Sequence, residues 1–203
     1  PSIIIFTTLS GLGYGLAMVL GLGLLDPAAF ATKIAHVLAI AMIGAGLMSS
    51  TLHLGNPQRA WRALSQWRSS WLSREGVLSI VTFVPLLWST WACVIEGRYL
   101  ALPGLSGSVL SLVTVFCTAM IYTSLKSVQA WHTPLTPACY LLFAAAGGLV
   151  LASLFAFAGG GNASLLAVLA AVALMAAWIV KATWRRNMLT LTPLSTPETA
   201  TGL

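Results

Sequence analysis

The amino-acid sequence predicts an all-α membrane protein, a bundle of about six transmembrane helices. Of its 203 residues, 58% are hydrophobic and 7% are charged, which is too few charges to cover the surface of a water-soluble domain. The apolar stretches recur along the whole chain, so a single signal sequence does not explain them. Each approaches the roughly 20 residues that a spanning helix needs, whereas a membrane β-barrel would show short alternating strands.

The first three spans are delimited by prolines, glycines and charged residues. The first covers about residues 3–25 and stops at Asp26-Pro27, because proline cannot continue a helix. The second covers about residues 34–51 and is followed by Gly55, a residue typical of helix C-terminal caps. The third covers about residues 76–95 and is closed by a Glu-Gly-Arg sequence.

Similar signals delimit the last three spans. The fourth covers about residues 109–125, follows a connection rich in proline and glycine, and ends before Lys126. The fifth covers about residues 138–158 and begins after the two prolines of the segment SVQAWHTPLTP. A turn of three glycines and an asparagine leads to the sixth, about residues 164–180, which ends at Lys181.

Small residues in the first two spans predict close packing between helices. Gly11 and Gly15 have the four-residue spacing that lets a neighbouring helix approach closely, and Gly44 and Gly46 are expected to act in the same way. The alternative is that a ligand presses on the bare backbone of these glycines.

The positions of the charges predict the orientation of the chain. With six spans, eight of the ten Lys and Arg residues share one side, and Lys33 and Arg98 lie on the other. The positive-inside rule places the cation-rich side in the cytoplasm. The net charge of +6 then suits anionic membrane lipid or an acidic partner protein. Nucleic acid is not expected as a partner, because no soluble domain would present a groove-reading element.

We expect a single transmembrane domain over residues 1–190, with an interfacial loop at 55–74 and a polar tail or linker at 191–203. Between residues 59 and 72 a three- or four-residue spacing, typical of a helix lying in the membrane interface, is kept by Trp61, Leu64, Trp67 or Arg68, and Trp71. Such a helix anchors the protein to lipid, and it can also offer a docking face to a soluble subunit. The residues expected in these roles are Arg62, Arg68, Trp61, Trp67, Trp71, Trp131 and His132.

His53 and Glu75 are expected at the ends of two antiparallel helices, and therefore at the same depth. A quinone gains two electrons and two protons when it becomes a quinol, so its oxygens need groups that exchange protons near neutral pH. An imidazole and a carboxyl group in a low-dielectric setting are suitable. Alternatively, Glu75 only interacts with the helix dipole and His53 only bonds a carbonyl group. Arg74 and Arg59 are expected to orient the quinone or neutralise its reduced form, and Tyr122 to supply a hydroxyl donor.

Other chemistry is poorly supported by the residues. The three cysteines are isolated, so an iron–sulfur cluster or a structural zinc is not expected in this protein. His53 and His132 share one side, which leaves haem b as a less favoured alternative. The charged residues all lie near the span ends, which argues against a transporter. No P-loop, Rossmann glycine pattern or serine elbow is present.

The runs HLGNPQRAWRAL, SWLSRE and YTSLKSVQAWHTPLTP resemble the membrane-anchor subunits of dimethyl sulfoxide reductase, in the wider group that includes polysulfide reductase anchors. The resemblance extends over nearly the whole chain. It implies a bacterial inner-membrane subunit that binds menaquinone or ubiquinone, with a molybdopterin catalytic subunit and a ferredoxin-like iron–sulfur subunit as partners. In the family, the histidine of HLG and the acidic residue opening the next helix are associated with the quinol site, and they match His53 and Glu75.

The run WRALSQWRSSWLSRE is more similar to the anchors of the cytoplasm-facing sulfite-oxidising molybdoenzyme. This similarity implies quinone reduction coupled to sulfite oxidation, with the partner subunits on the cytoplasmic side. A quinol-oxidising anchor of a dimethyl sulfoxide reductase and a structural anchor without a quinone site remain alternatives. The family usually has eight spans, so two further helices are expected after the polar tail.

Overall fold

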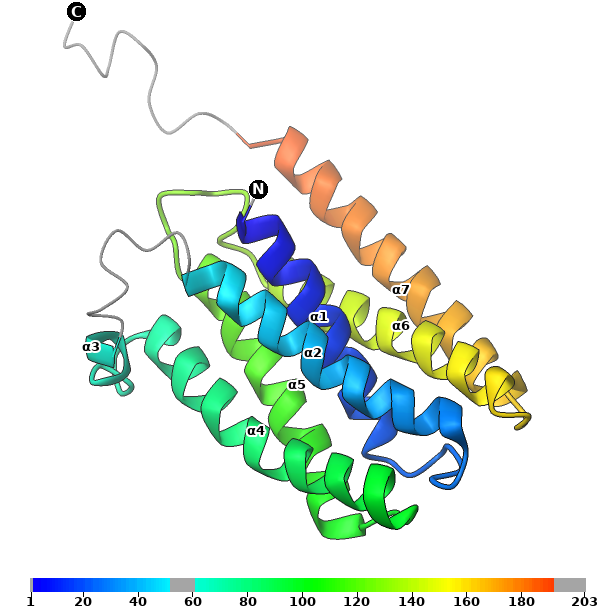
Figure 1. Cartoon of the computed structure of the whole chain (residues 1–203). Helices are drawn as coiled ribbons and strands as arrows, with labels where there is room; N and C mark the ends of the chain where they lie inside the picture. The colour runs from blue at the N-terminus through cyan, green and yellow to red at the C-terminus, as the bar shows by residue number, and fades with distance from the viewer. Residues whose placement is uncertain (1, 52–60, 192–203) are drawn as a thin grey trace, which may run out of the picture.

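A computed structural model describes residues 2–51 and 61–191 of the protein, and within these ranges it contains helices and no β-strand (Figure 1). Six of the described helices are long and apolar enough to cross a membrane, which confirms the predicted fold class. They are α1 (Ser2–Leu20), α2 (Phe30–Thr51), α4 (Trp71–Glu96), α5 (Ala101–Thr123), α6 (Leu135–Ala158) and α7 (Ser164–Leu189), and the short α3 is Trp61–Leu64.

Successive long helices run in opposite directions, so the bundle has two ends (Figure 1). One end of the bundle, which we call the α3 end, contains the short helix α3. The helices that begin at this end are α1, α4 and α6, and those that finish there are α2, α5 and α7. The opposite end, formed by the turns at residues 21–29, 97–100 and 159–163, we call the far end. Among the described residues, Lys33 and Arg98 lie at the far end. The other described Lys and Arg residues lie at or near the α3 end: Arg62, Arg68, Arg74, Lys126, Lys181, Arg185 and Arg186.

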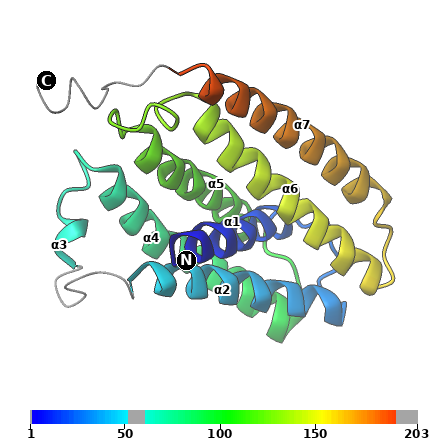
Figure 2. The ribbon, with the colours of Figure 1, turned by 90° about the horizontal axis from the view of Figure 1, so that it is seen from above.

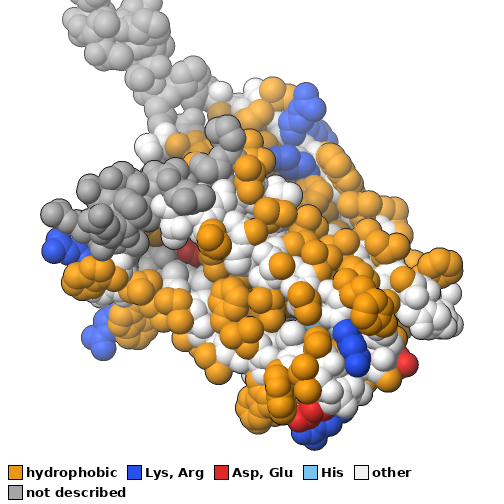
Figure 3. Space-filling model, viewed as in Figure 1, with side chains coloured by type: hydrophobic (Ala, Val, Ile, Leu, Met, Phe, Trp, Pro, Cys, Tyr) orange, Lys and Arg blue, Asp and Glu red, His pale blue; other side chains and the backbone are white. Residues whose placement is uncertain are grey.

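Helix α1 occupies the middle of the bundle (Figure 2). It packs against α2, α5 and α6, while α4 packs mainly against α5, and α7 packs mainly against α6. The buried side chains of Tyr14 and Leu16 on α1 meet those of Ile43 on α2 and Ala144 on α6 in the core. Hydrophobic side chains cover the flank of the bundle in Figure 3, as expected for a surface that faces lipid.

Glycines allow two of the closest contacts of α1. A Cβ atom at Gly15 would overlap the carbonyl oxygen of Ala144 and the backbone of Gly148 on α6, and one at Gly46 of α2 would lie 2.8 Å from the backbone nitrogen of Ser10. Since lipid tails are as apolar as the helices, such close van der Waals packing is a main source of helix association in membranes. The predicted close approach is therefore confirmed at Gly15 and Gly46.

Gly11 and Gly44 differ from these two positions. A Cβ atom added at either glycine would meet no atom within 4 Å, so the helix-packing prediction is wrong for this pair. Four-residue spacing on α1 places Gly11 on the same face as Gly15, but Gly11 borders a cavity instead of the backbone of α6.

Helix α4 begins at Trp71, five residues before the expected start at about residue 76. Its N-cap is Ser70, whose hydroxyl accepts a hydrogen bond from the backbone N–H of Ser73 at 3.4 Å, so polar residues that suggested a loop are already helical. The interfacial helix expected over residues 59–72 is accordingly short, because in its described part only Trp61–Leu64 is α-helical before the backbone turns into α4.

Helix α5 also begins earlier than expected, at Ala101 instead of about residue 109. Pro103 lies in its first turn, where a backbone N–H has no helical partner, so the proline is tolerated. A Cβ atom at Gly104 would lie 2.8 Å from the carbonyl oxygen of Gly21 and 2.7 Å from the ring of Tyr99. These residues therefore serve helix packing and not a connection.

Candidate functional site

The carboxyl group of Glu75 is buried near the α3 end, in the second turn of α4, with 6% of the residue exposed. One carboxylate oxygen accepts a hydrogen bond from the hydroxyl of Ser79 at 3.3 Å. Among the described residues, no basic side chain forms an ion pair with it, whereas Glu96 at the far end is paired with Arg98. A carboxyl group in such surroundings can carry a proton to or from a bound molecule.

Tyr14 of α1 extends this polar cluster across the helix interface. Its side chain is fully buried, and its hydroxyl makes no hydrogen bond within the described residues. Its polar neighbours are Ser79 and Glu75 of α4. Because unpaired polar groups are costly inside a membrane, this hydroxyl marks a place where a polar ligand atom or water would be stabilised.

Tyr122, near the end of α5, belongs to an aromatic cluster with Trp131 and Tyr140. Its ring stacks on Tyr140 of α6 with 5.6 Å between the ring centroids, and it meets Trp131 edge-on at 5.4 Å. Glu75 lies within electrostatic range of the phenol. Tyr122 therefore contacts α6 and lies within electrostatic range of the buried carboxyl group.

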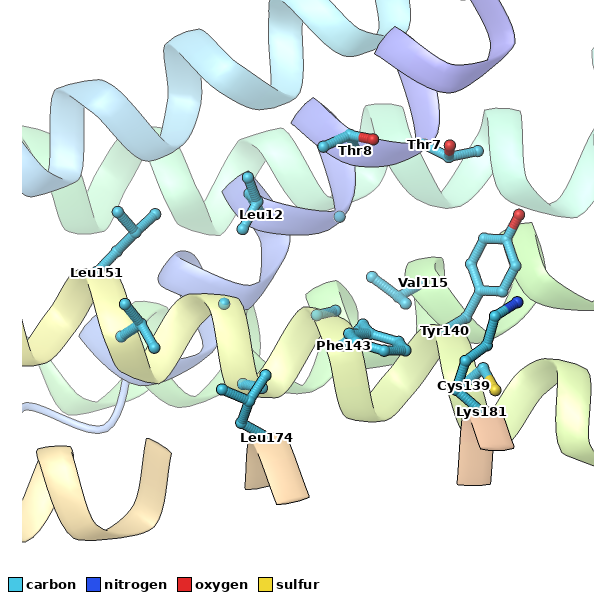
Figure 4. Close-up of a pocket in the computed structure, with 15 residues that line it drawn as sticks. Thr7, Thr8, Leu12, Val115, Cys139, Tyr140, Phe143, Leu151, Leu174 and Lys181 are labelled. Atoms are coloured by element: carbon cyan, nitrogen blue, oxygen red, sulfur yellow. The ribbon is translucent and has the colours of Figure 1, made fainter. Parts of the chain in front are cut away.

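A cavity of about 570 Å³ lies between α1, α6 and α7 and adjoins this cluster (Figure 4). Tyr140 and Lys181 lie at one end, towards the α3 end of the bundle, and Leu151 and Leu174 lie deeper. Its size falls within the range of roughly 300–1,000 Å³ that is usual for small-molecule pockets. A smaller cavity of about 290 Å³ adjoins it and shares several lining residues, while adding Tyr122, Trp131, Trp184 and Thr136.

Three residues of this region were not singled out from the sequence as site residues: Tyr14, Tyr140 and Lys181. Lys181 suggested the end of a span, but α7 continues to Leu189, and the ammonium group lies 3.7 Å from the ring centroid of Trp184. The three-residue spacing of Lys181 and Trp184 is a sequence signal for this cation–π pair. The positions of Tyr14 and Tyr140 depend on which helices pack together, and no local signal reveals that.

Two predicted site residues, His53 and Arg59, lie outside the described residues. Arg74 is described, and its guanidinium group is engaged by the backbone that precedes α4. It donates hydrogen bonds to the carbonyl oxygens of Trp67 at 3.0 Å and Arg68 at 2.6 Å, and it lies 4.3 Å from the ring centroid of Trp71. These contacts hold the turn before α4 against the helix.

Replacing Arg74 with glutamine should therefore loosen the turn at residues 65–70, because two charge-assisted hydrogen bonds are lost. We expect several-fold faster proteolytic cleavage in this turn in detergent. Arg62→Gln is the matched control, since Arg62 lies in the same region and contacts the ring of Trp61 only at 5.6 Å. Equal cleavage in both variants would contradict a structural role for the Arg74 contacts.

The residues expected at the lipid or partner interface lie at the α3 end. Trp61 and Trp67 are exposed, and Arg68 lies 5.6 Å from the ring centroid of Trp67. His132 is exposed as well, and its Nδ1 lies 2.7 Å from the carbonyl oxygen of Thr123, the last residue of α5. Within residues 2–51 and 61–191, no group of three or more His, Cys, Asp and Glu side chains is arranged to hold a metal ion.

Comparisons with known proteins give one consistent family. The sequence profile of the DMSO reductase anchor subunit (DmsC) matches residues 1–201. A sulfite dehydrogenase subunit of Allochromatium vinosum is 34% identical over 175 residues, which make up 76% of this protein and 54% of that one. An anaerobic dimethyl sulfoxide reductase subunit of Haemophilus influenzae is 29% identical, over 55% of this protein and 41% of that one. The subunit of the same name in Escherichia coli is 26% identical, over 66% and 48%.

This chain thus spans about half the length of these relatives. No solved structure matches it.

Proposed function

Because the chain belongs to the family of dimethyl sulfoxide reductase anchor subunits, we propose that it anchors a molybdenum oxidoreductase to the membrane and exchanges electrons with quinone. The electrons pass between the quinone and a ferredoxin-like iron–sulfur subunit, which connects to a molybdopterin catalytic subunit. The observation that carries the quinone proposal is the buried carboxyl group of Glu75, which has no counter-ion among the described residues.

Reduction of a quinone consumes two electrons and two protons, and the protons must reach the ring oxygens inside the membrane. We assign proton exchange to Glu75 and His53, and hydrogen bonding of a ring oxygen to the hydroxyl of Tyr122. The phenol of Tyr122 stacks on Tyr140 and lies within electrostatic range of Glu75, which supports a ring position between them. Arg59 and Arg74 are assigned to orient the ring or neutralise its reduced form.

The cavity between α1, α6 and α7 suits the apolar part of the same molecule. Its deep part is lined by aliphatic side chains, and its outer end carries Tyr140 and the ammonium group of Lys181. We propose that the isoprenoid tail occupies the deep part, and that Lys181 stabilises negative charge on the reduced ring. Menaquinone and ubiquinone both fit this description.

The partner subunits are assigned to the α3 end, where most of the basic side chains lie. By the positive-inside rule this end faces the cytoplasm of a bacterial inner membrane. The relative with 34% identity is a sulfite dehydrogenase subunit, which favours quinone reduction coupled to sulfite oxidation. The reverse direction, quinol oxidation coupled to sulfoxide reduction, is the second candidate, because two other relatives belong to dimethyl sulfoxide reductases.

Purification of the protein with its partners in mild detergent tests the class and the substrate. We expect a large molybdenum subunit and a cysteine-rich iron–sulfur subunit to co-purify, and the complex to reduce a quinone analogue with sulfite as donor. Turnover only with sulfoxide and quinol would reverse the proposed direction. Full assembly without binding of any quinone analogue would leave a structural anchor.

A substitution that fills the cavity should reduce quinone binding. Gly11→Leu places an aliphatic side chain in the cavity, whereas Gly44→Leu adds the same side chain at a glycine that also has free space but lies on α2, away from the cavity. We expect Gly11→Leu to bind a photoreactive quinone at least tenfold more weakly, which corresponds to a loss of about 1.4 kcal/mol of binding free energy. Binding by Gly44→Leu should be unchanged. Equal labelling of both variants would remove the cavity from the proposal.

A further inference from the structure

His36 is a buried ionisable residue that the quinone site does not use. It lies on α2, about two turns from the far end, with 8% of the residue exposed. Its Nδ1 atom lies 3.5 Å from the hydroxyl oxygen of Thr90 on α4. Ionisable side chains within membrane spans are rare and usually mark routes for ions or protons, so this histidine requires an explanation.

Two small cavities border His36, and both are also lined by Ser89. The first is lined by Ser89, Tyr99 and Arg98 and reaches the far end of the bundle. The second is lined by Ser89 and Thr90, by Gly104 nearer the far end, and by Leu86, which lies one turn of α4 further from that end. Each has a volume of about 10 Å³, which is close to the minimum that holds one water molecule. Polar groups that line both cavities could bond such water.

Hydroxyl groups continue from these cavities towards Glu75. Ser89, Thr82, Ser79 and Glu75 follow each other at helical spacing along one face of α4, and all four are buried. The carboxylate of Glu75 accepts a hydrogen bond from Ser79 at 3.3 Å. The buried polar side chains of α4 therefore run from the level of His36 to the quinone site.

Helix α5 adds hydroxyl groups to the same column. Thr114 lies 3.1 Å from Thr82, oxygen to oxygen. Ser111, one turn away from Thr114, is fully buried, and its hydroxyl oxygen has no hydrogen-bond partner among the described residues. The hydroxyl of Tyr14 beside Ser79 is unpartnered in the same way. Unpaired hydroxyls in a membrane interior are costly, and they are stabilised if water or a moving proton visits them.

We propose that His36, the two small cavities and this hydroxyl column form a proton path between the far end and Glu75. The inference rests on the proposed quinone function. Reduction of one quinone takes two electrons from the iron–sulfur subunit at the α3 end and two protons by way of Glu75, which is then reprotonated along the path from the far end. Oxidation of a quinol sends the two protons the opposite way. Because electrons and protons use different ends, turnover moves charge across the membrane.

Leu86 separates the second cavity from Thr82 along α4. It lies between Ser89 and Thr82 on the same face of α4, borders the second cavity, and has its side chain near Gly107 of α5. We expect water to connect the cavity to Thr82 when this side chain adopts another rotamer, a motion that is fast compared with enzyme turnover.

The native complex in sealed liposomes tests the path. Reduced methyl viologen added outside delivers electrons only to complexes whose α3 end faces outward, and a short-chain ubiquinone is the acceptor. A pH-sensitive dye inside the vesicles should report alkalinisation of the lumen by about two protons per quinone reduced. A lumen of constant pH with alkalinisation outside, at full quinone turnover, would overturn the path and leave the proposed function intact. Absence of quinone reduction would remove both.

Variants locate the path within the protein. His36→Gln and Ser111→Ala should slow luminal proton uptake and quinone reduction about tenfold, since proton delivery becomes rate-limiting, and the solvent deuterium isotope effect should increase. Ser106→Ala is the matched control, because the hydroxyl of this half-buried α5 serine already donates a hydrogen bond to the carbonyl oxygen of Leu102 within its own helix. Wild-type proton uptake in both path variants, with normal stability, would show that the protons do not pass these residues.

Discussion

Replacement of Glu75 with glutamine is expected to lower electron exchange with quinone by about a hundredfold to ten-thousandfold, the usual contribution of a positioned proton donor or acceptor. Glutamine keeps the size of the side chain and can still accept the hydrogen bond from Ser79, but it cannot release or take up a proton. The measurement is the rate of quinone reduction by the purified complex, compared with the rate at which the partner subunits reduce a soluble dye.

Two comparisons make this result specific. Glu96→Gln changes the other carboxyl group of α4, which lies at the far end beside Arg98, and should leave the quinone rate unchanged. The dye rate should remain at the wild-type level in both variants, because the molybdenum chemistry takes place in another subunit. Wild-type quinone turnover in Glu75→Gln would remove Glu75 from the site, and loss of both activities would indicate a role in assembly.

The number and type of the helices could be predicted because composition and the length of apolar runs are properties of each segment alone. Helix boundaries were less predictable where they depend on neighbours. Ser70 caps α4 through the backbone of Ser73, so residues as polar as Arg74 became helical. Gly104 suggested a connection, but it lies inside α5, where Tyr99 and the backbone of Gly21, just after α1, pack against it.

The residues of the candidate site also differ in how far they could be predicted from the sequence. Glu75 could be selected from its position between a loop and a span, and Tyr122 from its place near a span end. Tyr14 and Tyr140 come from helices far from α4 in the sequence, and their proximity to this region arises from the packing of α1 and α6 around it. His36 could be noted as a histidine near a span end, but its link to Glu75 depends on the facing surfaces of α4 and α5.

The stability of the bundle should be most sensitive to side-chain volume added where α1 contacts α6. In Gly15→Val, the new Cβ atom would overlap the carbonyl oxygen of Ala144, and backbone atoms cannot move aside as the end of a flexible side chain does. The helices must separate along their length, so we expect a destabilisation of about 3 kcal/mol or more, at or above the usual range for overpacking. Size-exclusion chromatography after heating in detergent should show little or no intact subunit.

Gly11→Val on the same helix is the matched control for this prediction. Both substitutions replace a glycine of α1 with the same β-branched residue, so they change the intrinsic helix propensity by the same amount. Only Gly15 faces the backbone of α6, whereas a Cβ atom at Gly11 would meet nothing within 4 Å. Heat stability of Gly11→Val should therefore stay close to that of the wild type. Equal losses of heat stability in the two variants would mean that the stability of α1 depends on the residue type and not on contact with the backbone of α6. The position of α6 beside α1, and with it the proposed quinone cavity between them, would then have to be reconsidered.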